Sequence, residues 1–452
     1  MDVITIETPS LGDRSYVVHD GEVALAIDPQ RDVDRLMCAV DDAGVRITHI
    51  AETHVHNDYV SGGLTLARLT DATYLHAADE PLRFDHTGVR DGDRFDVGQL
   101  HVEVRATPGH TPHHLTYVVT ADDAPPAVFT GGSLLYGTVG RTDLVGADQT
   151  EMLTREQYRS VHRLADSLPD EARILPTHGF GSFCASVSSD EDSDGRLGTE
   201  REVNVALTVA EDAFVERLLS SLDAFPRYYA HMGPLNLAGG VAIDLSPAAP
   251  IDPIEVVRRV HRGEWVVDLR PRNKFAAGHV VGTIGIELAD GFSTYLGWLV
   301  PWGMPITLLA DSAEEITDAQ RQLVRIGIDR PSGAARGGLE RWGHGAEWRS
   351  YRRISFADLP AGATVIDVRR RDEHDDRHLP GAINLAVHEL LDRLDEVPDG
   401  ELFVHCASGY RASIAASLLD RAGHDVVLVD DEVEHAFDSG RSDESGRSDE
   451  SA

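Results

Sequence analysis

The C-terminal half of the chain contains an internal repeat. The segment from Asp268 to Ile284 aligns without gaps onto the segment from Asp367 to Ile383. Two copies of one sequence unit predict two copies of one structural unit. The 452 residues allow about three domains, so the repeat leaves room for one larger domain before it.

Two histidines and an aspartate lie close together near the N-terminus, in the run THVHND at residues 53–58. Side chains alternate in an extended segment, so His54 and His56 point the same way and can bind one ion while Val55 packs behind them. A single histidine is more often a hydrogen-bonded core or surface residue than a ligand, and the chain has 22 histidines. The clustered spacing nevertheless favours a metal site.

Two later histidines are candidates for further ligands. His110 lies in the loop Thr107–Thr111, which is shaped by proline and glycine and follows the alternating strand pattern of residues 101–105. His178 lies in the segment Pro176–Gly179. We therefore expect His54, His56 and His110 to hold an ion, with His178 as a candidate fourth ligand.

These motifs resemble those of metallo-β-lactamase-fold proteins, and within that fold those of persulfide dioxygenases. The likeness rests on the H-x-H-x-D run, on the loop around His110, and on residues 130–132 (TGG) followed by residues 140–143 (GRTD). It implies that residues 1–245 form an αββα sandwich with metal ligands on loops at one sheet edge. It also implies that iron(II) and oxygen oxidise the outer sulfur of a thiol persulfide to sulfite, while Arg141 pairs with a carboxylate of the carrier thiol.

The chain departs from this family pattern at two positions. Gly132 stands where the family has its carboxylate ligand, and Tyr59 stands where the superfamily has a second-site histidine. A dinuclear zinc site is therefore not expected. One ferrous ion is favoured, and one zinc ion with an open position is the alternative. Asp58 could replace the missing carboxylate by approaching the ion; the opposing hypothesis is an inert scaffold.

A second candidate site lies at residues 405–411 (HCASGYR). A short apolar strand, residues 402–405, precedes it, and an amphipathic helix over residues 412–422 follows it. Cys406 would then lie among backbone N–H groups at a helix N-terminus, which favour a thiolate and a bound persulfide anion. We expect Cys406 to be the nucleophile. The substrate-binding residues expected beside it are Ser408, Gly409 and Tyr410.

The loop around Cys406 resembles the active loop of rhodanese sulfurtransferases. Supporting matches are residues 365–369 (VIDVR) and 378–384 (HLPGAIN). Cysteine phosphatase loops place five residues between cysteine and arginine, whereas four separate Cys406 from Arg411, which favours the sulfur-binding form. The resemblance implies that Cys406 carries sulfane sulfur and that Arg411 is part of the catalytic loop. We expect Arg411 to brace this loop through Asp367.

The first copy of the repeat is expected to be a rhodanese-like unit without activity. Its counterpart of the active loop, residues 308–315 (LLADSAEE), places Ala310 at the position of Cys406 and Glu315 at the position of Arg411. No nucleophile remains, and an acidic loop should repel anions. We expect this unit to be structural or a docking surface.

The composition argues against several partners. Asp and Glu number 76 against 41 Lys and Arg, and the net charge of −35 would repel the phosphates of nucleic acid. Lys274 is the sole lysine, and dense carboxylates with almost no lysine resemble proteins of salt-loving microbes. The apolar run of residues 295–310 is short and is broken by proline and glycine, so we expect no membrane span.

The three cysteines do not form a disulfide framework, which suits a cytoplasmic protein, and no signal segment is recognisable. Cys38 follows the apolar pattern of Val33, Leu36 and Val40 and is predicted to lie in the core. Cys184 follows His178 closely enough to approach the metal pocket, but a structural role is predicted for it.

These features predict an α/β chain in which the N-terminal sandwich is followed by two rhodanese domains with central parallel sheets. The expected division is a metallo-β-lactamase-like domain (1–245), a linker (246–252), an inactive rhodanese-like domain (253–350), a rhodanese domain (351–437) and a disordered acidic tail (438–452).

The predicted function is oxidation and transfer of persulfide sulfur. The expected partners are a low-molecular-weight thiol persulfide, thiosulfate or sulfite, and the sequence is compatible with a homo-oligomer. Two alternatives stay open. One is a glyoxalase-II-like thioester hydrolase, and the other is a sulfur carrier with an inert metal domain.

Overall fold

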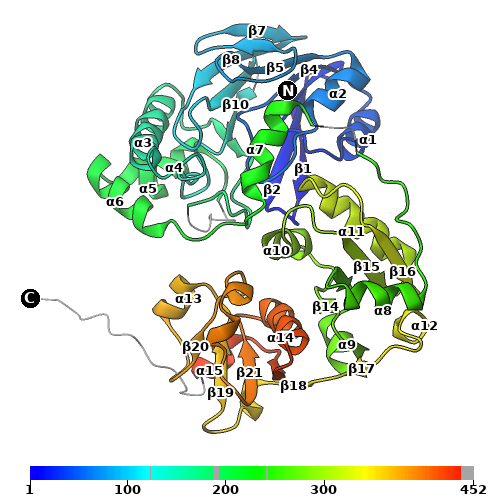
Figure 1. Cartoon of the computed structure of the whole chain (residues 1–452). Coiled ribbons are helices and arrows are strands. Elements are labelled where there is room, and N and C mark those ends of the chain that lie inside the picture. Colours follow the sequence, from blue (N-terminus) through cyan, green and yellow to red (C-terminus); the bar gives the residue numbers. More distant parts are fainter. Residues whose placement is uncertain (123, 187–192, 241–242, 439–452) are drawn as a thin grey trace, which may run out of the picture. The chain divides into compact units, whose positions relative to one another are not determined.

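The computed structural model of the protein describes residues 1–122, 124–186, 193–240 and 243–438 (Figure 1). Its contacts divide the chain into two compact units. Unit 1 comprises Met1–Asp244 and Arg321–Asp329, and unit 2 comprises Leu245–Gln320 and Arg330–Ala452. The tail predicted for residues 438–452 lies, after its first residue, outside the described residues.

Unit 1 contains two mixed sheets. The first has the order β1 (Asp2–Thr8), β2 (Asp13–His19), β3 (Val23–Ile27), β4 (Arg46–Ala51), β5 (Thr73–Ala77), β6 (Thr87–Val89). The second has the order β11 (Arg173–Pro176), β10 (Ala124–Gly131), β9 (Leu115–Ala121), β8 (Leu100–Ala106), β7 (Arg94–Val97). The helices of this unit are α1 (Asp34–Ala43), α2 (Gly63–Thr70), α3 (Thr150–Asp166), α4 (Leu197–Val203), α5 (Val205–Thr208), α6 (Glu211–Ser221) and α7 (Tyr229–Ala238).

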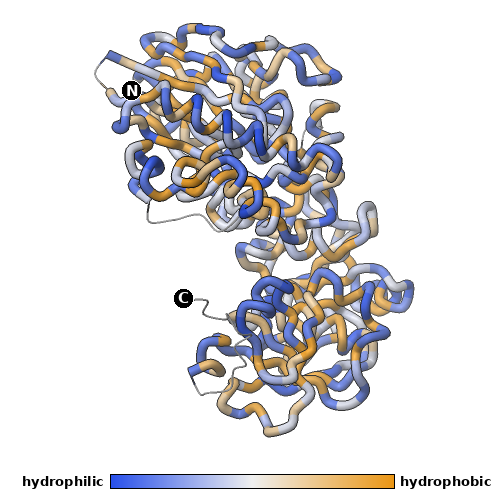
Figure 2. The backbone as a smooth tube through the Cα atoms, turned by 90° about the vertical axis from the view of Figure 1, so that its left-hand side faces the viewer, coloured by the Kyte–Doolittle hydropathy of each residue, from blue (hydrophilic) through white to orange (hydrophobic). Residues whose placement is uncertain are grey.

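Alternation along the strands explains the layers of unit 1. In β2, Tyr16 and Val18 are buried in the core that both sheets share, whereas Val17 packs in a separate core with residues of α1 and α2. The ring centroids of Tyr16 and Phe129 lie 5.4 Å apart, which joins the two sheets. Figure 2 shows hydrophobic and hydrophilic residues interspersed along the backbone.

A third core lies on the outer face of the second sheet. It brings Val118 of β9 together with Val161 of α3 and Phe214 of α6. The helices α3 and α6 therefore cover this face, while α1 and α2 cover the first sheet (Figure 1). The result is the expected αββα sandwich.

Unit 2 contains two parallel sheets. The first has the order β14 (Ile284–Gly285), β12 (Trp265–Asp268), β15 (Ile306–Ala310), β16 (Gly333–Arg336). The second has the order β18 (Arg352–Ile354), β22 (Asp425–Val429), β21 (Glu401–His405), β19 (Thr364–Asp367), β20 (Ile383–Asn384). A short antiparallel pair is formed by β13 (His279–Val280) and β17 (Trp348–Arg349).

The helices of unit 2 follow its strands. They are α8 (Pro253–His261), α9 (Arg272–Ala277), α10 (Phe292–Leu299), α12 (Leu339–Trp342), α13 (Arg371–Asp376), α14 (Tyr410–Ala422) and α15 (Val433–Asp438), with 3-10 turns at Phe356–Asp358, Leu390–Asp392 and Leu394–Glu396. The helix α11 (Ala313–Arg325) begins in unit 2, and its last residues belong to unit 1. The helix predicted from residue 412 begins earlier, at Tyr410.

The internal repeat is visible in equivalent hydrogen bonds of the two sheets. Arg270 and Arg369 each bind the aspartate two residues before them at 2.6 Å, and each donates at 2.8 Å to a carbonyl eight residues later. The strand order β14-β12-β15-β16 matches β20-β19-β21-β22. The two sequence copies therefore adopt the same strand order and the same local fold.

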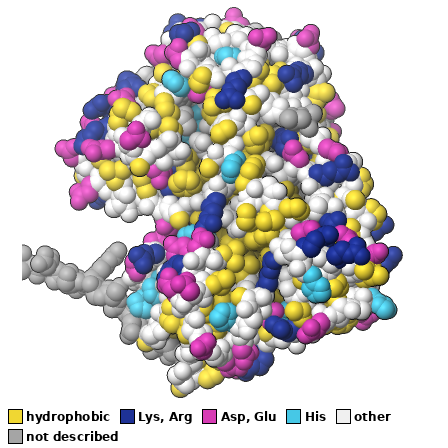
Figure 3. Space-filling model, viewed as in Figure 1, with side chains coloured by type: hydrophobic (Ala, Val, Ile, Leu, Met, Phe, Trp, Pro, Cys, Tyr) yellow, Lys and Arg dark blue, Asp and Glu magenta, His cyan; other side chains and the backbone are white. Residues whose placement is uncertain are grey.

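The surface of the face shown in Figure 3 carries acidic and basic side chains interspersed with each other. Many of the arginines form ion pairs with neighbouring carboxylates, as in the exposed pairs Arg90–Asp79 and Arg352–Glu401. Among the described residues, no helix is both long and apolar enough to cross a bilayer.

Candidate metal centre and sulfur-transfer loop

Three loops at the ends of strands bring the predicted histidines of unit 1 together. His54 and His56 follow β4, His110 follows β8, and His178 follows β11. The side chains of all four are buried. Strands whose ends meet at one edge of the sandwich therefore place these residues, which are distant in the sequence, in one cluster.

The imidazole nitrogens converge closely enough to share an ion. One ring nitrogen from each of His54, His56 and His178 lies within 4.8 Å of the others. The Nε2 atoms of His54 and His178 are 3.2 Å apart. The ring centroids of His54 and His110 are 4.8 Å apart.

Hydrogen-bond partners outside the cluster determine which ring nitrogen of His110 and of His56 faces the other histidines. His110 Nδ1 donates to the carbonyl of Arg141 at 2.7 Å, and His56 Nε2 faces the Glu52 carboxylate at 3.2 Å. The opposite nitrogens, His110 Nε2 and His56 Nδ1, are buried and have no hydrogen-bond partner among the described residues. Histidine ligands of metals are oriented in this way, so the donor set suits a bound ion.

The electrostatics keep part of the cluster neutral. Burial lowers the pKa of His54 well below its usual value and lowers the pKa of His110 to about 3, so both rings offer lone pairs. Burial also disfavours the charged form of His178, but the carboxylates of Asp58 and Asp13 outweigh it and raise its pKa. In the same way Asp28 raises the pKa of His56 to about 9 against the effect of burial.

Asp58 and Tyr59, the residues in doubt at the end of the histidine run, each approach a histidine of the cluster, and Asp58 forms with Asp13 and His178 a group that could also hold an ion. The Asp58 carboxylate faces His178 Nδ1 at 3.1 Å, and Asp13 approaches the same atom at 2.9 Å. The Tyr59 hydroxyl lies 3.0 Å from His56 Nε2. Asp58 is thus placed to orient His178, and its predicted role as a direct ligand stays a prediction.

The space around Gly132 explains why a carboxylate is absent there. A Cβ atom at Gly132 would lie 2.2 Å from Cδ2 of His110. Gln157 holds both groups in place, because its Oε1 accepts from the His110 N–H at 2.6 Å and its Nε2 donates to the Gly132 carbonyl at 3.2 Å. His110 therefore occupies the space next to the missing ligand.

Arg141 is held by partners within the protein, and its predicted pairing with a substrate carboxylate stays a prediction. Its guanidinium is buried and makes two bonds to the Asp143 carboxylate, at 2.7 and 2.8 Å. It also donates to the carbonyls of Phe183 and Asp223, at 3.2 and 2.6 Å. These four bonds fix the guanidinium, and the one to Phe183 ties Arg141 to the loop after β11.

Of the two cysteines of unit 1, Cys38 differs from its prediction, and Cys184 lies near the histidines as its sequence position suggested. Cys38 is exposed on α1, whose buried face contains Leu36 and Val40, so the predicted core position is wrong. Cys184 is buried, and its sulfur lies within 4.8 Å of ring nitrogens of both His110 and His178. Burial raises the pKa of the Cys184 thiol, and Asp58 and Asp13 raise it further.

Several residues of this site were not predicted from the sequence. Glu52, Asp13 and Asp28 orient the histidines, and His114 accepts the Gly132 N–H at 3.0 Å. His114 lies four residues after His110, and this i, i+4 spacing was the one available signal. Asp13 and Asp28 lie far from the histidine motif in sequence, so only the fold relates them to it, whereas Glu52 is two residues before His54.

The loop around Cys406 begins at the end of β21 and leads into α14. Cys406 is buried, and the Gly409 N–H points at its sulfur over 3.2 Å. Gly409 has a φ of +89°, a conformation that favours glycine, and it is the N-cap of α14. Ser408 is exposed at the rim of this loop. The predicted strand–loop–helix arrangement places the sulfur against the Gly409 backbone N–H at the start of the helix.

The expected brace between Arg411 and Asp367 is wrong. The Arg411 guanidinium instead binds the Glu373 carboxylate, with Nη2 and Oε1 2.7 Å apart. Asp367 is occupied by Arg369 at 2.6 Å and by His374 at 2.9 Å. Arg411 still braces the loop around Cys406, but it does so against α13 rather than the end of β19.

In the first repeat, the loop equivalent to the one around Cys406 is filled by the side chain of Glu315. The N–H of Leu269 donates to the Leu309 carbonyl, and in the second repeat the N–H of Val368 donates to the His405 carbonyl in the same way. The residue after each carbonyl is therefore equivalent, which places Ala310 at the position of Cys406. The Glu315 carboxylate accepts from the N–H groups of Asp311 and Ser312, at 2.8 and 3.0 Å. A carboxylate therefore occupies N–H groups that an anionic sulfur group would use.

Residues of the first repeat contact the loop around Cys406. The Tyr410 hydroxyl donates to the Glu287 carbonyl at 3.0 Å, and the ring centroids of Tyr410 and Tyr295 are 5.8 Å apart. Trp298 stacks on His388 with ring centroids 4.5 Å apart. Tyr295 lies near enough for its pKa, which burial raises, to respond to Arg411 and Cys406.

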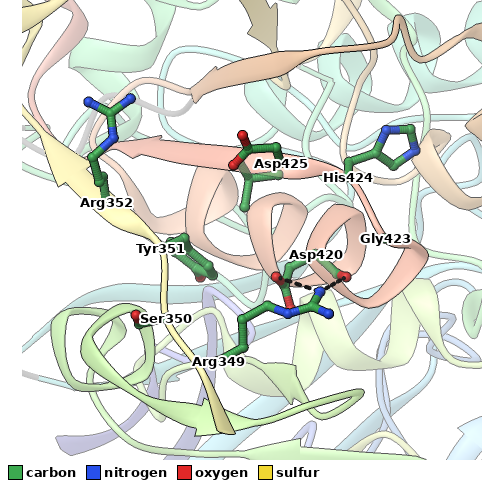
Figure 4. Close-up of a pocket in the computed structure, with 9 residues that line it drawn as sticks. Arg349, Ser350, Tyr351, Arg352, Asp420, Gly423, His424 and Asp425 are labelled. Carbon is green, nitrogen blue, oxygen red and sulfur yellow. Dashed lines mark hydrogen bonds and ion pairs between the residues drawn. The ribbon is translucent and has the colours of Figure 1, made fainter.

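A cavity of about 480 Å³ lies elsewhere in unit 2 (Figure 4). Arg349 and Asp420 point toward each other there and form an ion pair at 3.2 Å. Cys406 does not line this cavity. Of the charged residues that do line it, Arg349 and Asp420 pair with each other, and Arg352 pairs with Glu401. The cavity is thus separate from the sulfur-transfer loop.

Known proteins resemble both halves of this arrangement. Residues 355–434 match the family described as rhodanese-like domain. The mitochondrial persulfide dioxygenase ETHE1 of Bos taurus is 30% identical over 238 residues, which span 51% of this chain and 83% of that protein. A hydroxyacylglutathione hydrolase of Maricaulis maris is 30% identical over 218 residues, spanning 47% of this chain and 79% of that protein. A metallo-beta-lactamase of Staphylococcus aureus has a similar structure, with a TM-score of 0.66 and 27% identity, covering 74% of this chain and 98% of that one.

The fold and its histidine loops thus define a protein of the metallo-β-lactamase fold that also carries a rhodanese-like domain. The chain belongs to the family of persulfide dioxygenase ETHE1, to which its N-terminal region is homologous. Both resemblances predicted from the sequence motifs are confirmed at this level.

The contact at Gly132 generates a prediction for metal binding. Gly132→Ala should force His110 out of position, because the added Cβ would overlap its ring, and should weaken metal affinity by about 10-fold or more. Equilibrium dialysis against Fe(II) or Zn(II) measures this loss. Gly198→Ala is the matched control, since its Cβ would meet its nearest heavy atom at 3.1 Å. Unchanged affinity in Gly132→Ala would contradict a ligand role for His110.

Proposed function

We propose that the chain oxidises the outer sulfur of a low-molecular-weight thiol persulfide in unit 1 and transfers sulfane sulfur through Cys406 in unit 2. The observation that carries this proposal is the cluster of buried imidazoles, in which His110 Nε2 and His56 Nδ1 lack partners among the described residues. Homology to a persulfide dioxygenase and the presence of a rhodanese-like domain support it.

The oxidation balances with one oxygen molecule. One persulfide, one dioxygen and one water give one thiol, one sulfite and two protons, and the four electrons released by sulfur reduce the oxygen. A ferrous ion held by His54, His56 and His110 would supply the oxygen chemistry that side chains lack, and zinc is the alternative ion. The protein contributes a buried pocket that excludes bulk water, with rings oriented by Arg141 and Glu52.

The transfer step uses the thiolate of Cys406. Its sulfur attacks the outer sulfur of a persulfide, the carrier leaves as a thiolate, and Cys406 becomes a persulfide. Sulfite then attacks that outer sulfur and leaves as thiosulfate, which restores the thiolate. The Gly409 N–H, 3.2 Å from the sulfur, stabilises the negative charge in both steps. Arg411 acts by holding the loop through Glu373.

The first repeat takes no part in sulfur chemistry in this proposal. Ala310 offers no nucleophile, and Glu315 fills the N–H groups of its loop. Its role is to support the active loop through Tyr295 and Glu287, which contact Tyr410. We accordingly assign residues 1–245, 253–350 and 351–437 to three domains, with 246–252 as the linker. A cytoplasmic location stays a prediction.

A thioester hydrolase is the second candidate, and similarity to a hydroxyacylglutathione hydrolase favours it. Attack by a metal-bound hydroxide on a carbonyl usually uses two ions. Tyr59, in place of a second-site histidine, weighs against a second ion. Thioester hydrolysis would also give the rhodanese-like domain no role in the reaction. The third candidate is a sulfur carrier, in which Cys406 binds sulfur and the metal domain is inert.

Oxygen uptake tests the oxidation. Protein purified without oxygen, reconstituted with iron(II) and given a small-thiol persulfide in high salt should consume oxygen. His110→Ala should lose this activity by about 100-fold or more, because a ligand is removed. His101→Ala is the matched control, since His101 is 63% exposed on β8. Equal uptake by wild-type protein and His110→Ala would reject the oxidation.

Transfer of sulfur from thiosulfate to cyanide tests the second step. Cys406→Ser should reduce the rate on the order of 10³-fold or more, because the nucleophile is lost. Cys38→Ser, at an exposed position of α1, should retain the full rate. Persistent transfer in Cys406→Ser would show that another group carries the sulfur.

A further inference from the structure

The loop after β11 carries a second donor beside His178. Cys184 is fully buried, and its sulfur lies within 4.8 Å of ring nitrogens of His110 and His178. We propose that Cys184 binds the metal ion as a thiolate and takes the place of the carboxylate that Gly132 lacks. This inference rests on the part of the proposed function in which the histidines bind an ion, and not on which reaction follows.

The distances suit a shared ion. Nitrogen and sulfur ligands of a tetrahedral ion lie about 2.0 to 2.3 Å from it and therefore roughly 3.3 to 3.6 Å from each other. The three donor atoms already lie within 4.8 Å of one another, so contraction by about an ångström would complete the geometry. Rotation of the Cys184 and His178 side chains could supply a movement of that size.

A separate observation points to a ligand at this place. His110 Nε2 is buried and has no hydrogen-bond partner among the described residues, although its Nδ1 is bound to the Arg141 carbonyl. Its cluster with His178 contains no carboxylate and has Cys184 as its third member. The nitrogen therefore lies beside a sulfur donor among buried side chains, where an unpaired polar atom is costly.

One residue positions both donors. The Arg141 carbonyl accepts from His110 at 2.7 Å, and the Arg141 N–H donates to the Cys184 carbonyl at 2.8 Å. Its side chain also binds the Phe183 carbonyl at 3.2 Å. The neighbouring residues Gly140 and Ala185 form a β-bridge. The loop that carries Cys184 is thus fixed to the segment that orients His110, as a preorganised site requires.

The charge balance also favours a thiolate. Replacement of a carboxylate by Gly132 removes one negative charge from the ligand set, and a thiolate restores it. A thiol that binds a cation does so as the thiolate, because the ion displaces its proton. The sulfur makes a weak contact with the Tyr229 hydroxyl, at 3.9 Å, which an ion would replace without breaking a strong bond.

Cobalt(II) substitution tests this inference by spectroscopy. Metal-free full-length protein titrated with Co(II) should show one intense near-ultraviolet thiolate-to-metal charge-transfer band and bind one equivalent. Cys184→Ala should lose the band and bind Co(II) about 10-fold or more weakly. Cys406→Ser and Cys38→Ser should retain it, since these cysteines lie elsewhere.

The outcomes separate this inference from the proposed function. Stoichiometric Co(II) binding without the band, or a band that persists in Cys184→Ala, would overturn the thiolate ligand and leave the histidine site standing. Absence of stoichiometric binding to wild-type protein would overturn both. If Cys184→Ala does not fold, X-ray absorption of the wild-type Co(II) protein decides the matter. One sulfur at about 2.3 Å supports the inference, and nitrogen and oxygen neighbours alone reject it.

Discussion

The buried carboxylate of Asp28 holds the candidate metal centre together. It accepts hydrogen bonds from the backbone and hydroxyl of Thr53, at 2.6 and 2.7 Å, and from the hydroxyl of Thr177. It also faces His56 Nε2 at 3.3 Å. Thr53 precedes His54 and Thr177 precedes His178, so one carboxylate at the end of β3 ties two histidine loops to each other.

This carboxylate stays charged although it is buried. Burial would raise its pKa, but His56 and the hydrogen bonds lower it to about 2. Asp28 has a φ of +50°, a conformation that is uncommon outside glycine and that tends to occur at functional sites. Removal of one partner from such a buried network would leave an uncompensated charge, which explains why the rest of the site depends on it.

The sequence could predict the fold class and the members of the histidine cluster, because strand ends followed by histidines place those side chains at one edge. It could also predict the loop of Cys406 from its position between an apolar strand and a helix. It could not identify Asp28 or Asp13 as partners, since neither carries a motif and only the tertiary fold brings them to the histidines. The partner of Arg411 was missed for a related reason, because Asp367 is already occupied by Arg369 and His374.

The two copies of the repeat show how one loop can be kept or lost on the same scaffold. Both retain the buried aspartate–arginine pair that supports the first strand. In one copy the loop presents Cys406 to a backbone N–H, and in the other Glu315 fills the loop. The supporting interactions therefore persist where the proposed chemistry does not, which separates the requirements of folding from those of catalysis.

The most direct test of the proposed function follows the outer sulfur itself. Iron(II)-loaded protein given a thiol persulfide with an isotopically labelled outer sulfur should form labelled sulfite only when oxygen is present. With excess persulfide it should then form thiosulfate through Cys406. Labelled sulfite that forms equally without oxygen, or none at all from fully iron-loaded protein, would contradict the account.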